Sequence, residues 1–260
     1  MTKTMGVHQL SNVRKRAQNA SPTSQARFRS GVAPTLAESE YQKLRDRIVS
    51  MELLPGAAIS ESELAAQSGV SRTPVREAVL RLAREDLLEV APKSGTFVAR
   101  IPVSVLPEAL IARRALEGVT AVAAAKEASR SQKLELHALL ERQREFADLG
   151  DFEGFHASDE ALHQKIAEIG RLPGLWAMVQ QVKLQIDRFR RLTLPEPGRM
   201  HMALGQHTDV VTAIENNEPE VARQKMDIHL NGLQHHIKYV VDANPDFFIH
   251  DADLNNLVNV

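Results

Sequence analysis

Four residues in the second half of the chain have side chains that bind divalent metal ions: Asp159, His163, His207 and His229. Asp159 and His163 are four residues apart, so in a helix they share one face. His207 and His229 lie about ten residues before and after a predicted turn at 216–219, so in an antiparallel helical hairpin both stand roughly 15 Å from that turn. Three helices could therefore bring one carboxylate and three imidazoles together inside a bundle.

Imidazole and carboxylate ligands suit zinc best, with nickel, manganese or iron as alternatives. The chain has no cysteine, which excludes a thiolate metal site and a disulfide scaffold. A single Asp and His at this spacing also arise often by chance, so the site depends on all four residues. Other histidines compete for the same role, and we interpret them as surface residues or as neighbours of the ligands: His156, His201, His235 and His236.

A second group of residues, near position 70, has the chemistry for reading DNA. A helix from Ser71 to Arg84 would carry Arg72 and Arg76 one turn apart near its start. The planar guanidinium of arginine can donate two hydrogen bonds to guanine O6 and N7. The opposite face is apolar and predicted to be buried, with Val75, Ala78, Val79 and Leu82.

Four further residues extend this predicted DNA interface. The hydroxyls of Ser71 and Thr73, with the free N–H groups of the first helical turn, can bind phosphate. The turn that follows the helix could place Lys93 and the backbone of Gly95 over the neighbouring minor groove or phosphates. Any one surface arginine is more often merely solvated, so the interpretation depends on the order of the surrounding elements.

These elements follow the order of a winged helix–turn–helix domain over residues 35–101. A helix begins near Thr35, and a second, starting at Ser60 with Glu63 three residues later, ends at Gly69. After the arginine-bearing helix, residues 87–90 and 96–99 are rich in β-forming side chains and are joined by a turn at 92–95. Residues 102–106 are predicted to be a linker.

The remainder is predicted to be an antiparallel all-α bundle, which we assign to effector binding, metal binding and dimerisation over residues 107–243. Short breaks containing Gly, Pro or Asn separate its helices. The expected helices cover 105–129, 131–148, 152–169, 174–193, 199–216 and 219–242. Residues 1–34 contain no acidic residue and are predicted to be a disordered basic arm, and the tail at 244–260 is expected to fray.

Composition agrees with a mostly α protein. Apolar residues make up 43% of the 260 residues and aromatic residues only 4%. The net charge of −1 gives no global basic signature, so any nucleic-acid binding must depend on a local patch. No signal peptide or membrane span is evident, and we expect a soluble cytoplasmic protein without a membrane partner.

Residues 40–101, and above all "GVSRTPVREA" at 69–78, resemble the DNA-binding domain of the GntR family of bacterial repressors. The resemblance implies base or phosphate contacts by Arg72, Thr73 and Arg76, with further contacts from the wing. The chain departs from the family pattern at Ser94, where arginine is common, and at Asp86, where glycine is common.

Residues 107–240 resemble the ligand-sensing helical (FCD) domain of the FadR-type branch of that family, through "RRALEGVTAVAAAKEA", "DEALHQKIAEIG" and "QHTDVVTAIENNEPEVARQKMDIHL". Members with one Asp and three His at these places bind a divalent metal that helps to hold a carboxylate effector. The resemblance implies that Asp159, His163, His207 and His229 bind a metal in this way. It also implies that Arg113 binds the effector. The alternative for Arg113 is a helix-surface salt bridge with Glu117. The family commonly has Phe at Leu162 and Asn at Arg171.

We therefore expect a homodimeric transcriptional repressor of a carbon-source catabolic operon, with no catalytic residues. It would bind a palindromic DNA operator and sense a small carboxylate. A sugar acid is implied because "RFRRLTL", "QHTDVVTAI" and "NPDFF" resemble members of the family that regulate sugar-acid catabolism. One alternative is a metal-dependent hydrolase or isomerase that uses the Asp/His₃ site, with Glu160 or His156 as the general base. Another is a structural zinc site without an effector.

Overall fold

The computed structural model describes residues 34–253. The chain divides into one unit from Met1 to Pro34 and a second from Thr35 to Val260. Apart from Pro34, the predicted basic arm lies outside the described residues, as do residues 254–260 of the predicted tail.

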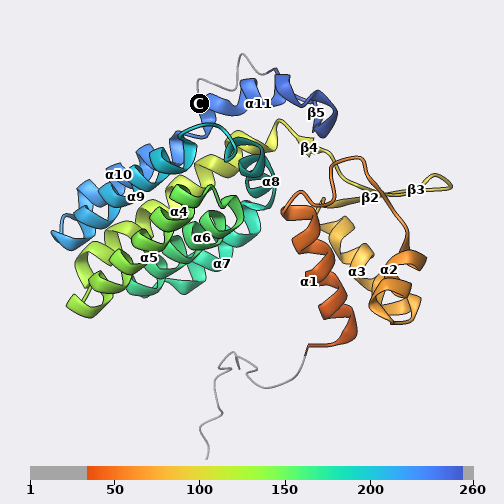
Figure 1. Ribbon diagram of the computed structural model, residues 1–260, viewed down its shortest axis with the longest axis horizontal. Helices are drawn as coiled ribbons and strands as arrows, with labels where there is room; N and C mark the ends of the chain where they lie inside the picture. The colour runs from red at the N-terminus through yellow and green to blue at the C-terminus, as the bar shows by residue number, and fades with distance from the viewer. Residues whose placement is uncertain (1–33, 254–260) are drawn as a thin grey trace, which may run out of the picture. The chain divides into compact units, whose positions relative to one another are not determined.

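The first described part is a winged helix–turn–helix domain (Figure 1). Its strands form an antiparallel sheet in the order β1-β3-β2, in which Leu88 lies opposite Val98. The two-residue strand β1 was not predicted from the sequence. The elements are α1 (Leu36–Val49), β1 (Ala58–Ile59), α2 (Glu61–Ser68), α3 (Arg72–Arg84), β2 (Leu88–Ala91) and β3 (Gly95–Val98).

Local chemistry fixes the ends of these helices. The hydroxyls of Thr35 and Ser60 accept hydrogen bonds from the backbone N–H groups three residues later, which caps α1 and α2. Gly69 ends α2 in the left-handed conformation, with φ at 65°, where a Cβ is disfavoured. The tight turn from α2 to α3 therefore depends on Gly69, as the sequence predicted.

The core of this domain is formed where α1 and α3 pack together beneath the sheet. The apolar face predicted for α3 is confirmed, because all four of its residues are buried. Replacing one of them, Leu82, by alanine would cost about 2–5 kcal/mol of stability, since it is fully buried.

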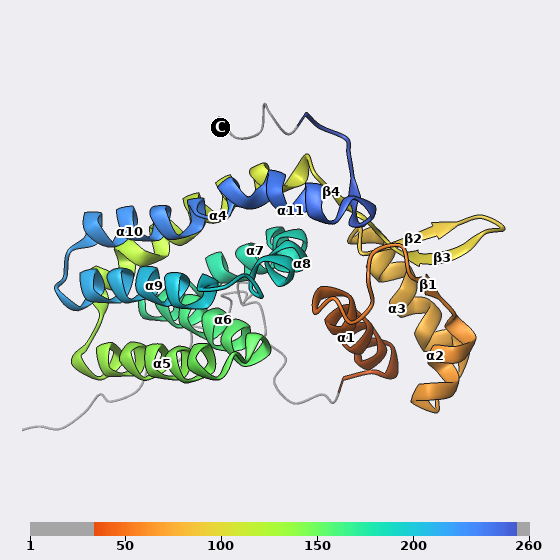
Figure 2. The same cartoon turned by 45° about the horizontal axis from the view of Figure 1, so that its top comes forward.

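The second part is a helical bundle (Figures 1 and 2). Helix α9 lies between α10 and α5, α10 also packs against α4, and α6 packs against both α4 and α5. Its apolar core includes the fully buried Leu136, Phe155 and Ile214. The helices are α4 (Val105–Glu127), α5 (Arg130–Leu149), α6 (Phe152–Ile169), α7 (Pro173–Val182), α8 (Leu184–Thr193), α9 (Arg199–Glu215) and α10 (Pro219–Asn231). The predicted fold class, a winged helix–turn–helix followed by an all-α bundle, is thus confirmed.

Two of the predicted helices are interrupted. The one expected over 174–193 is divided at Lys183 into α7 and α8, and the Lys183 ammonium is buried between Glu160 and Asp187. The one expected over 219–242 ends at Asn231 and is followed by a 3₁₀ turn, η1 (Gln234–His236), and α11 (Ile237–Ala243). No Pro or turn sequence marks the break at Lys183. At the second break, Gly232 is the one residue that signals the end of a helix.

The expectation that the tail frays from residue 244 is wrong for the described part of it. A 3₁₀ turn, η2 (Pro245–Phe247), leads into β5 (Phe248–Ile249), which pairs in parallel with β4 (Ile101–Pro102). Phe248 is buried in an apolar cluster, and the carboxylate of Asp251 accepts hydrogen bonds from the backbone and hydroxyl of Ser104. The tail and the predicted linker therefore hold each other in place.

The end of α6 carries two unusual adjacent residues. A Cβ at Gly170 would lie 2.9 Å from the Cβ of Ala123, so glycine is required there by the close approach of α4. Arg171 follows with φ at 58°, and its N–H and that of Leu172 bond back to the carbonyls of Glu168 and Ala167. A residue in the left-handed conformation at a helix end is normally Gly or Asn, so the backbone of Arg171 is strained.

Candidate nucleic-acid interface and metal centre

Helix α3 presents its arginines to solvent. The side chains of Arg72 and Arg76 are 71% and 68% exposed and lie 3.8 Å and 4.0 Å from one carboxylate oxygen of Glu61 at the start of α2. Ion pairs this exposed are weak, so Glu61 can orient both guanidinium groups and still release them to a stronger acceptor such as DNA.

The other predicted DNA contacts lie at the same end of α3 and at the tip of the wing. Ser71 is the N-cap residue of α3, but its hydroxyl does not cap the helix, and both Ser71 and Thr73 are exposed. Lys93 is exposed in the β2–β3 turn, as is Gly95 at the start of β3, and both have positive φ angles. All six predicted residues are therefore free to meet a ligand.

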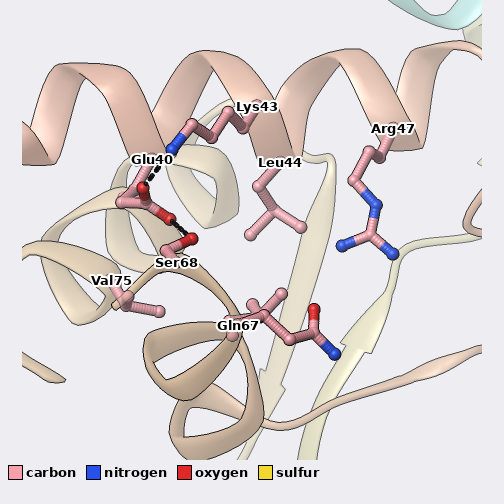
Figure 3. A pocket seen from close by; sticks show the side chains of 9 residues that line it. Glu40, Lys43, Leu44, Arg47, Gln67, Ser68 and Val75 are labelled. Atoms are coloured by element: carbon pink, nitrogen blue, oxygen red, sulfur yellow. Dashed lines mark hydrogen bonds and ion pairs between the residues drawn. The ribbon is translucent and has the colours of Figure 1, made fainter. Parts of the chain in front are cut away.

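A buried carboxylate fixes the orientation of α2 against α1. Glu40 accepts hydrogen bonds from the Lys43 ammonium at 2.8 Å and from the Ser68 hydroxyl at 2.6 Å (Figure 3). It borders a cavity of about 280 Å³ whose apolar lining includes Leu44 and Val75. We interpret Glu40 as a structural residue, because its hydrogen bond to Ser68 holds the end of α2 in place just before the turn into α3.

In the bundle, the four predicted metal ligands come together. Asp159 and His163 extend from α6, His207 from α9 and His229 from α10, and all four are buried. One ligand atom from each lies within 4.8 Å of the others. A tetrahedral zinc site holds its ligand atoms about 3.4 Å apart, so a small contraction around a cation would complete it.

Each imidazole is held by its outer nitrogen. The Nδ1 atoms of His207 and His229 face the amide oxygens of Gln143 at 2.7 Å and of Gln206 at 3.2 Å. Gln143 donates its own amide N–H to the carbonyl of Ser158, so its oxygen can only accept the proton of His207 Nδ1. This tautomer leaves the Nε2 lone pair directed into the cluster, as a metal requires.

The inward nitrogens fit a metal cation. The Nε2 atoms of His207 and His229 are 3.1 Å apart, and two lone pairs at that distance repel unless a proton or cation lies between them. Burial lowers the pKa of His207 to about 3 and that of His229 well below its ordinary value, which disfavours the proton. Nε2 of His163 is buried and has no hydrogen-bond partner among the described residues. The donor set therefore suits a divalent metal.

Asp159 is shared between this cluster and a buried arginine. Arg190, from α8, donates two hydrogen bonds of 2.7 Å to the two oxygens of Asp159, one of which lies 3.3 Å from Nε2 of His207. Burial alone would raise the pKa of Asp159, but the guanidinium opposes it and holds that pKa well below its ordinary value. Asp159 is therefore an anion, the form that binds a metal.

Arg113 lies in a second buried ion pair beside the cluster. Its Nε donates to Glu117 at 2.6 Å, and the other carboxylate oxygen of Glu117 lies 2.5 Å from Nδ1 of His163. Burial would raise the pKa of Glu117, but Arg113 and His163 lower it to about 2. The pair with Glu117 thus exists but is buried rather than on the surface, and Nη2 of Arg113 has no hydrogen-bond partner within residues 34–253.

Comparison with known proteins agrees with both halves of this geometry. Residues 36–98 match the bacterial regulatory proteins of the gntR family, and residues 108–232 match the FCD domain. An HTH-type transcriptional regulator from an unstable DNA locus of Streptomyces ambofaciens is 38% identical over 82% of this chain and 89% of its own length. The chain belongs to the gntR family of bacterial regulatory proteins.

Two other comparisons bear on the same assignment. A probable D-xylose utilization operon transcriptional repressor from Paenarthrobacter nicotinovorans is 33% identical over 72% of this chain and 84% of its own length. The solved structure of E. coli McbR/YncC has a TM-score of 0.69 at 24% identity, covering 80% of this chain and 98% of that one, which shows a shared fold.

This gntR-family protein is therefore a DNA-binding transcriptional regulator and not an enzyme, which removes the hydrolase or isomerase alternative. Its FCD domain implies a small-molecule effector, and the Asp/His₃ cluster lies within the matched residues. Among the described residues, no helix is long and apolar enough to span a membrane.

Sequence reasoning missed the residues that hold the ligands. Gln143, Gln206 and Arg190 were not predicted, although Arg190 lies in the "RFRR" sequence that had been noticed for another reason. Glu117 was noticed only as a partner of Arg113. The pair of Arg113 and Glu117 could be identified because the two residues are four apart on one helix. The contact between Arg190 and Asp159 joins residues 31 positions apart, so no local pattern in the sequence indicates it.

Proposed function

We propose that this protein is a homodimeric repressor of a carbon-source catabolic operon whose affinity for a palindromic operator responds to a small carboxylate bound at a metal centre. The observation that carries the proposal is the convergence of three buried imidazoles and one buried carboxylate, whose ligand atoms lie within 4.8 Å of one another. Asp159, His163, His207 and His229 would hold the metal, for which zinc fits best and nickel, manganese and iron are alternatives.

The effector would be a sugar acid or a similar carboxylate. Arg113 is assigned to its binding because Nη2 of this buried guanidinium lacks a hydrogen-bond partner in the described part of the chain, and a buried donor is costly until it is satisfied. The name of the Paenarthrobacter relative, a repressor of D-xylose utilization, supports control of carbon-source catabolism. A metal open to a further ligand could supply the second contact to the carboxylate.

Helix α8 offers a route from this centre to the DNA-binding domain. It carries Arg190, which holds Asp159, and also Arg188, whose Nη2 donates to the carbonyl of Ala99 just after β3 at 2.5 Å. On the same helix, Gln185 donates to the carbonyl of Asp86. An effector that changed the Asp159–Arg190 pair would bias these contacts, and a coupling of about 1–3 kcal/mol is enough to change operator affinity.

In the DNA complex, Arg72 and Arg76 would read base edges in the major groove, Ser71 and Thr73 would bind phosphate, and Lys93 and Gly95 would reach the neighbouring groove. Arg76 tests this assignment most simply. Its side chain is exposed and, among the described residues, makes a single long ion pair, so Arg76→Ala should leave the melting temperature unchanged.

The DNA experiment uses a duplex selected by the wild-type protein from a randomised pool, with binding measured by fluorescence anisotropy. Arg76→Ala should weaken binding by about five- to 150-fold, because a bidentate base contact contributes about 1–3 kcal/mol. Arg144→Ala is the matched control, since Arg144 is an exposed arginine of α5 that pairs with Glu141 on the same helix. Equal affinities for both variants would refute the interface.

The sensing half of the proposal is tested by thermal melting of the zinc-loaded protein against sugar acids, dicarboxylates, short hydroxy acids and fatty acids. A ligand at 100 times its dissociation constant stabilises the protein by about 2.7 kcal/mol. One class should raise the melting temperature, and EDTA should abolish the effect. If no class does so while zinc is bound, the site is structural and the sensing proposal fails.

A further inference from the structure

A carboxylate lies among the residues assigned to DNA reading, where it would meet a polyanion. Glu61 is the first residue of α2, and its Oε2 lies 3.8 Å from Nη2 of Arg72 and 4.0 Å from Nη1 of Arg76. Helix α2 packs against α3 (Figure 2), and the two arginines are four residues apart, so they share one face of α3. One anion therefore lies beside both of the predicted base-reading cations.

The three side chains are held to different degrees. That of Glu61 is 18% exposed, whereas those of Arg72 and Arg76 are 71% and 68% exposed. Both distances are too long for hydrogen bonds, so the carboxylate attracts the two guanidinium groups without occupying their N–H donors. Glu61 can therefore hold both arginines toward the start of α2 and leave each planar fork able to bind a ligand.

The charge of Glu61 acts differently on the two kinds of acceptor that DNA offers to an arginine. Guanine O6 and N7 are neutral, whereas each phosphate is an anion. The two guanidinium groups and the carboxylate sum to one net positive charge. This end of α3 therefore attracts a phosphate less than two free arginines would, because Glu61 repels it. A hydrogen bond to a neutral guanine acceptor loses much less, so the carboxylate favours base edges over the backbone.

Helix stabilisation is the other role that an acidic residue at this position can have, because a carboxylate in the first turn interacts favourably with the helix dipole. Glu63 lies in the same turn of α2 and is exposed. It comes two residues after Glu61 and therefore lies on a different side of the helix. Glu63 thus provides a matched control for the charge of Glu61 and for its effect on the helix.

We propose that Glu61 is a positioning residue for sequence specificity: it holds Arg72 and Arg76 together and lowers their attraction to phosphate, so that both select the neutral acceptors of guanine. The inference rests on the proposed assignment of these two arginines to base reading. On non-specific DNA, the protein then gains little by placing the arginines on phosphates, whereas at the operator the same arginines form their base contacts. Glu61 therefore controls the ratio of specific to non-specific affinity.

The test measures binding of the full chain to two duplexes by fluorescence anisotropy, over a series of salt concentrations. One is the duplex selected by the wild type, and the other has the same length and composition in shuffled order. Glu61→Gln should bind the shuffled duplex about five- to tenfold more tightly at about 0.1 M salt, with a salt slope steeper by about 1, because it permits roughly one further phosphate contact. Its affinity for the selected duplex should change by less than about twofold, since there the arginines contact bases.

Two further variants separate the charge of Glu61 from a structural role. Glu61→Asp keeps the carboxylate, so its affinity for the shuffled duplex should stay within about twofold of the wild type. Glu63→Gln removes one negative charge from the same helical turn but away from the arginines, and it should also leave that affinity within about twofold. Thermal melting verifies that all three variants are folded.

The outcomes distinguish this inference from the proposed interface. Equal affinities of Glu61→Gln and Glu63→Gln for the shuffled duplex would overturn the role of Glu61, and so would a Glu61→Asp variant that behaves as Glu61→Gln does. If Arg76→Ala weakens binding to the selected duplex as expected while Glu61→Gln leaves the shuffled duplex unaffected, the role of Glu61 alone is refuted. If Arg76→Ala and Arg144→Ala bind the selected duplex equally, the interface itself is refuted.

Discussion

Asp159 has two roles in this account, as a metal ligand and as the partner of Arg190, and a double-mutant cycle separates them. The two side chains form two hydrogen bonds of 2.7 Å and are both buried. Removing one partner of a buried ion pair costs about 3–5 kcal/mol, because the other charge stays buried and unpaired. Asp159→Asn and Arg190→Met should each destabilise the metal-free bundle by that amount.

The double variant Asp159→Asn/Arg190→Met should recover most of this loss, since replacing a whole buried pair by less polar groups of similar volume is often neutral. The assay is guanidinium unfolding in EDTA followed by tryptophan fluorescence. Trp176 is the single tryptophan of the chain and stacks near His163, with ring centroids 6.4 Å apart, so it reports on the bundle around the site.

Metal binding distinguishes the two roles. Arg190→Met should still bind zinc, because it keeps the Asp159 carboxylate. Asp159→Asn and the double variant should lose zinc affinity, although the double variant is stable. Two results would refute the reasoning. A cost below about 1 kcal/mol for Asp159→Asn would show that the pair is not a buried ion pair. Wild-type zinc affinity in the double variant would show that Asp159 is not a ligand.

Three further predictions concern stability. In the metal-free protein, burial lowers the pKa of His207 from an ordinary 6.5 to about 3. Between pH 6.5 and pH 3 this histidine therefore binds a proton in the unfolded chain but not in the folded one. The free energy of unfolding should fall as the pH falls through this range. Denaturant titrations should show this group removing about 2 kcal/mol between pH 7 and pH 5, a loss that His207→Gln should not show. At the end of α6, Arg171→Gly should stabilise by about 1 kcal/mol by relieving the positive φ. Gly170→Ala should destabilise the protein, because the added Cβ would clash with Ala123. If thermal melts shifted the melting temperatures of Arg171→Gly and Gly170→Ala in the same direction, both predictions could not be right.

Much of the fold follows from local patterns in the sequence. The buried face of α3 follows from apolar residues at helical spacing, and Gly69 marks the turn before it. The meeting of His207 and His229 could be predicted because a short turn between antiparallel helices places residues equally far from it at the same height.

The remainder depends on contacts between distant parts of the chain. Pairing of β4 with β5 joins residues more than 140 positions apart, and two-residue strands have no periodicity to detect. The break at Lys183 reflects the burial of its ammonium among carboxylates rather than a helix-breaking residue. Arg190 was missed for the same reason, since only the tertiary fold brings its side chain from α8 to Asp159 on α6.

The central claim is that Asp159 and the three histidines bind one divalent metal ion. The most direct test is the zinc content of the full chain by elemental analysis after dialysis against zinc and gel filtration. The wild type should retain one ion per chain. His163→Ala should retain none, because His163 belongs to the cluster and its Nε2 has no hydrogen-bond partner among the described residues. The variant His137→Ala, at an exposed histidine, should behave as the wild type. A wild type without zinc, or an unchanged content in His163→Ala, would contradict the account.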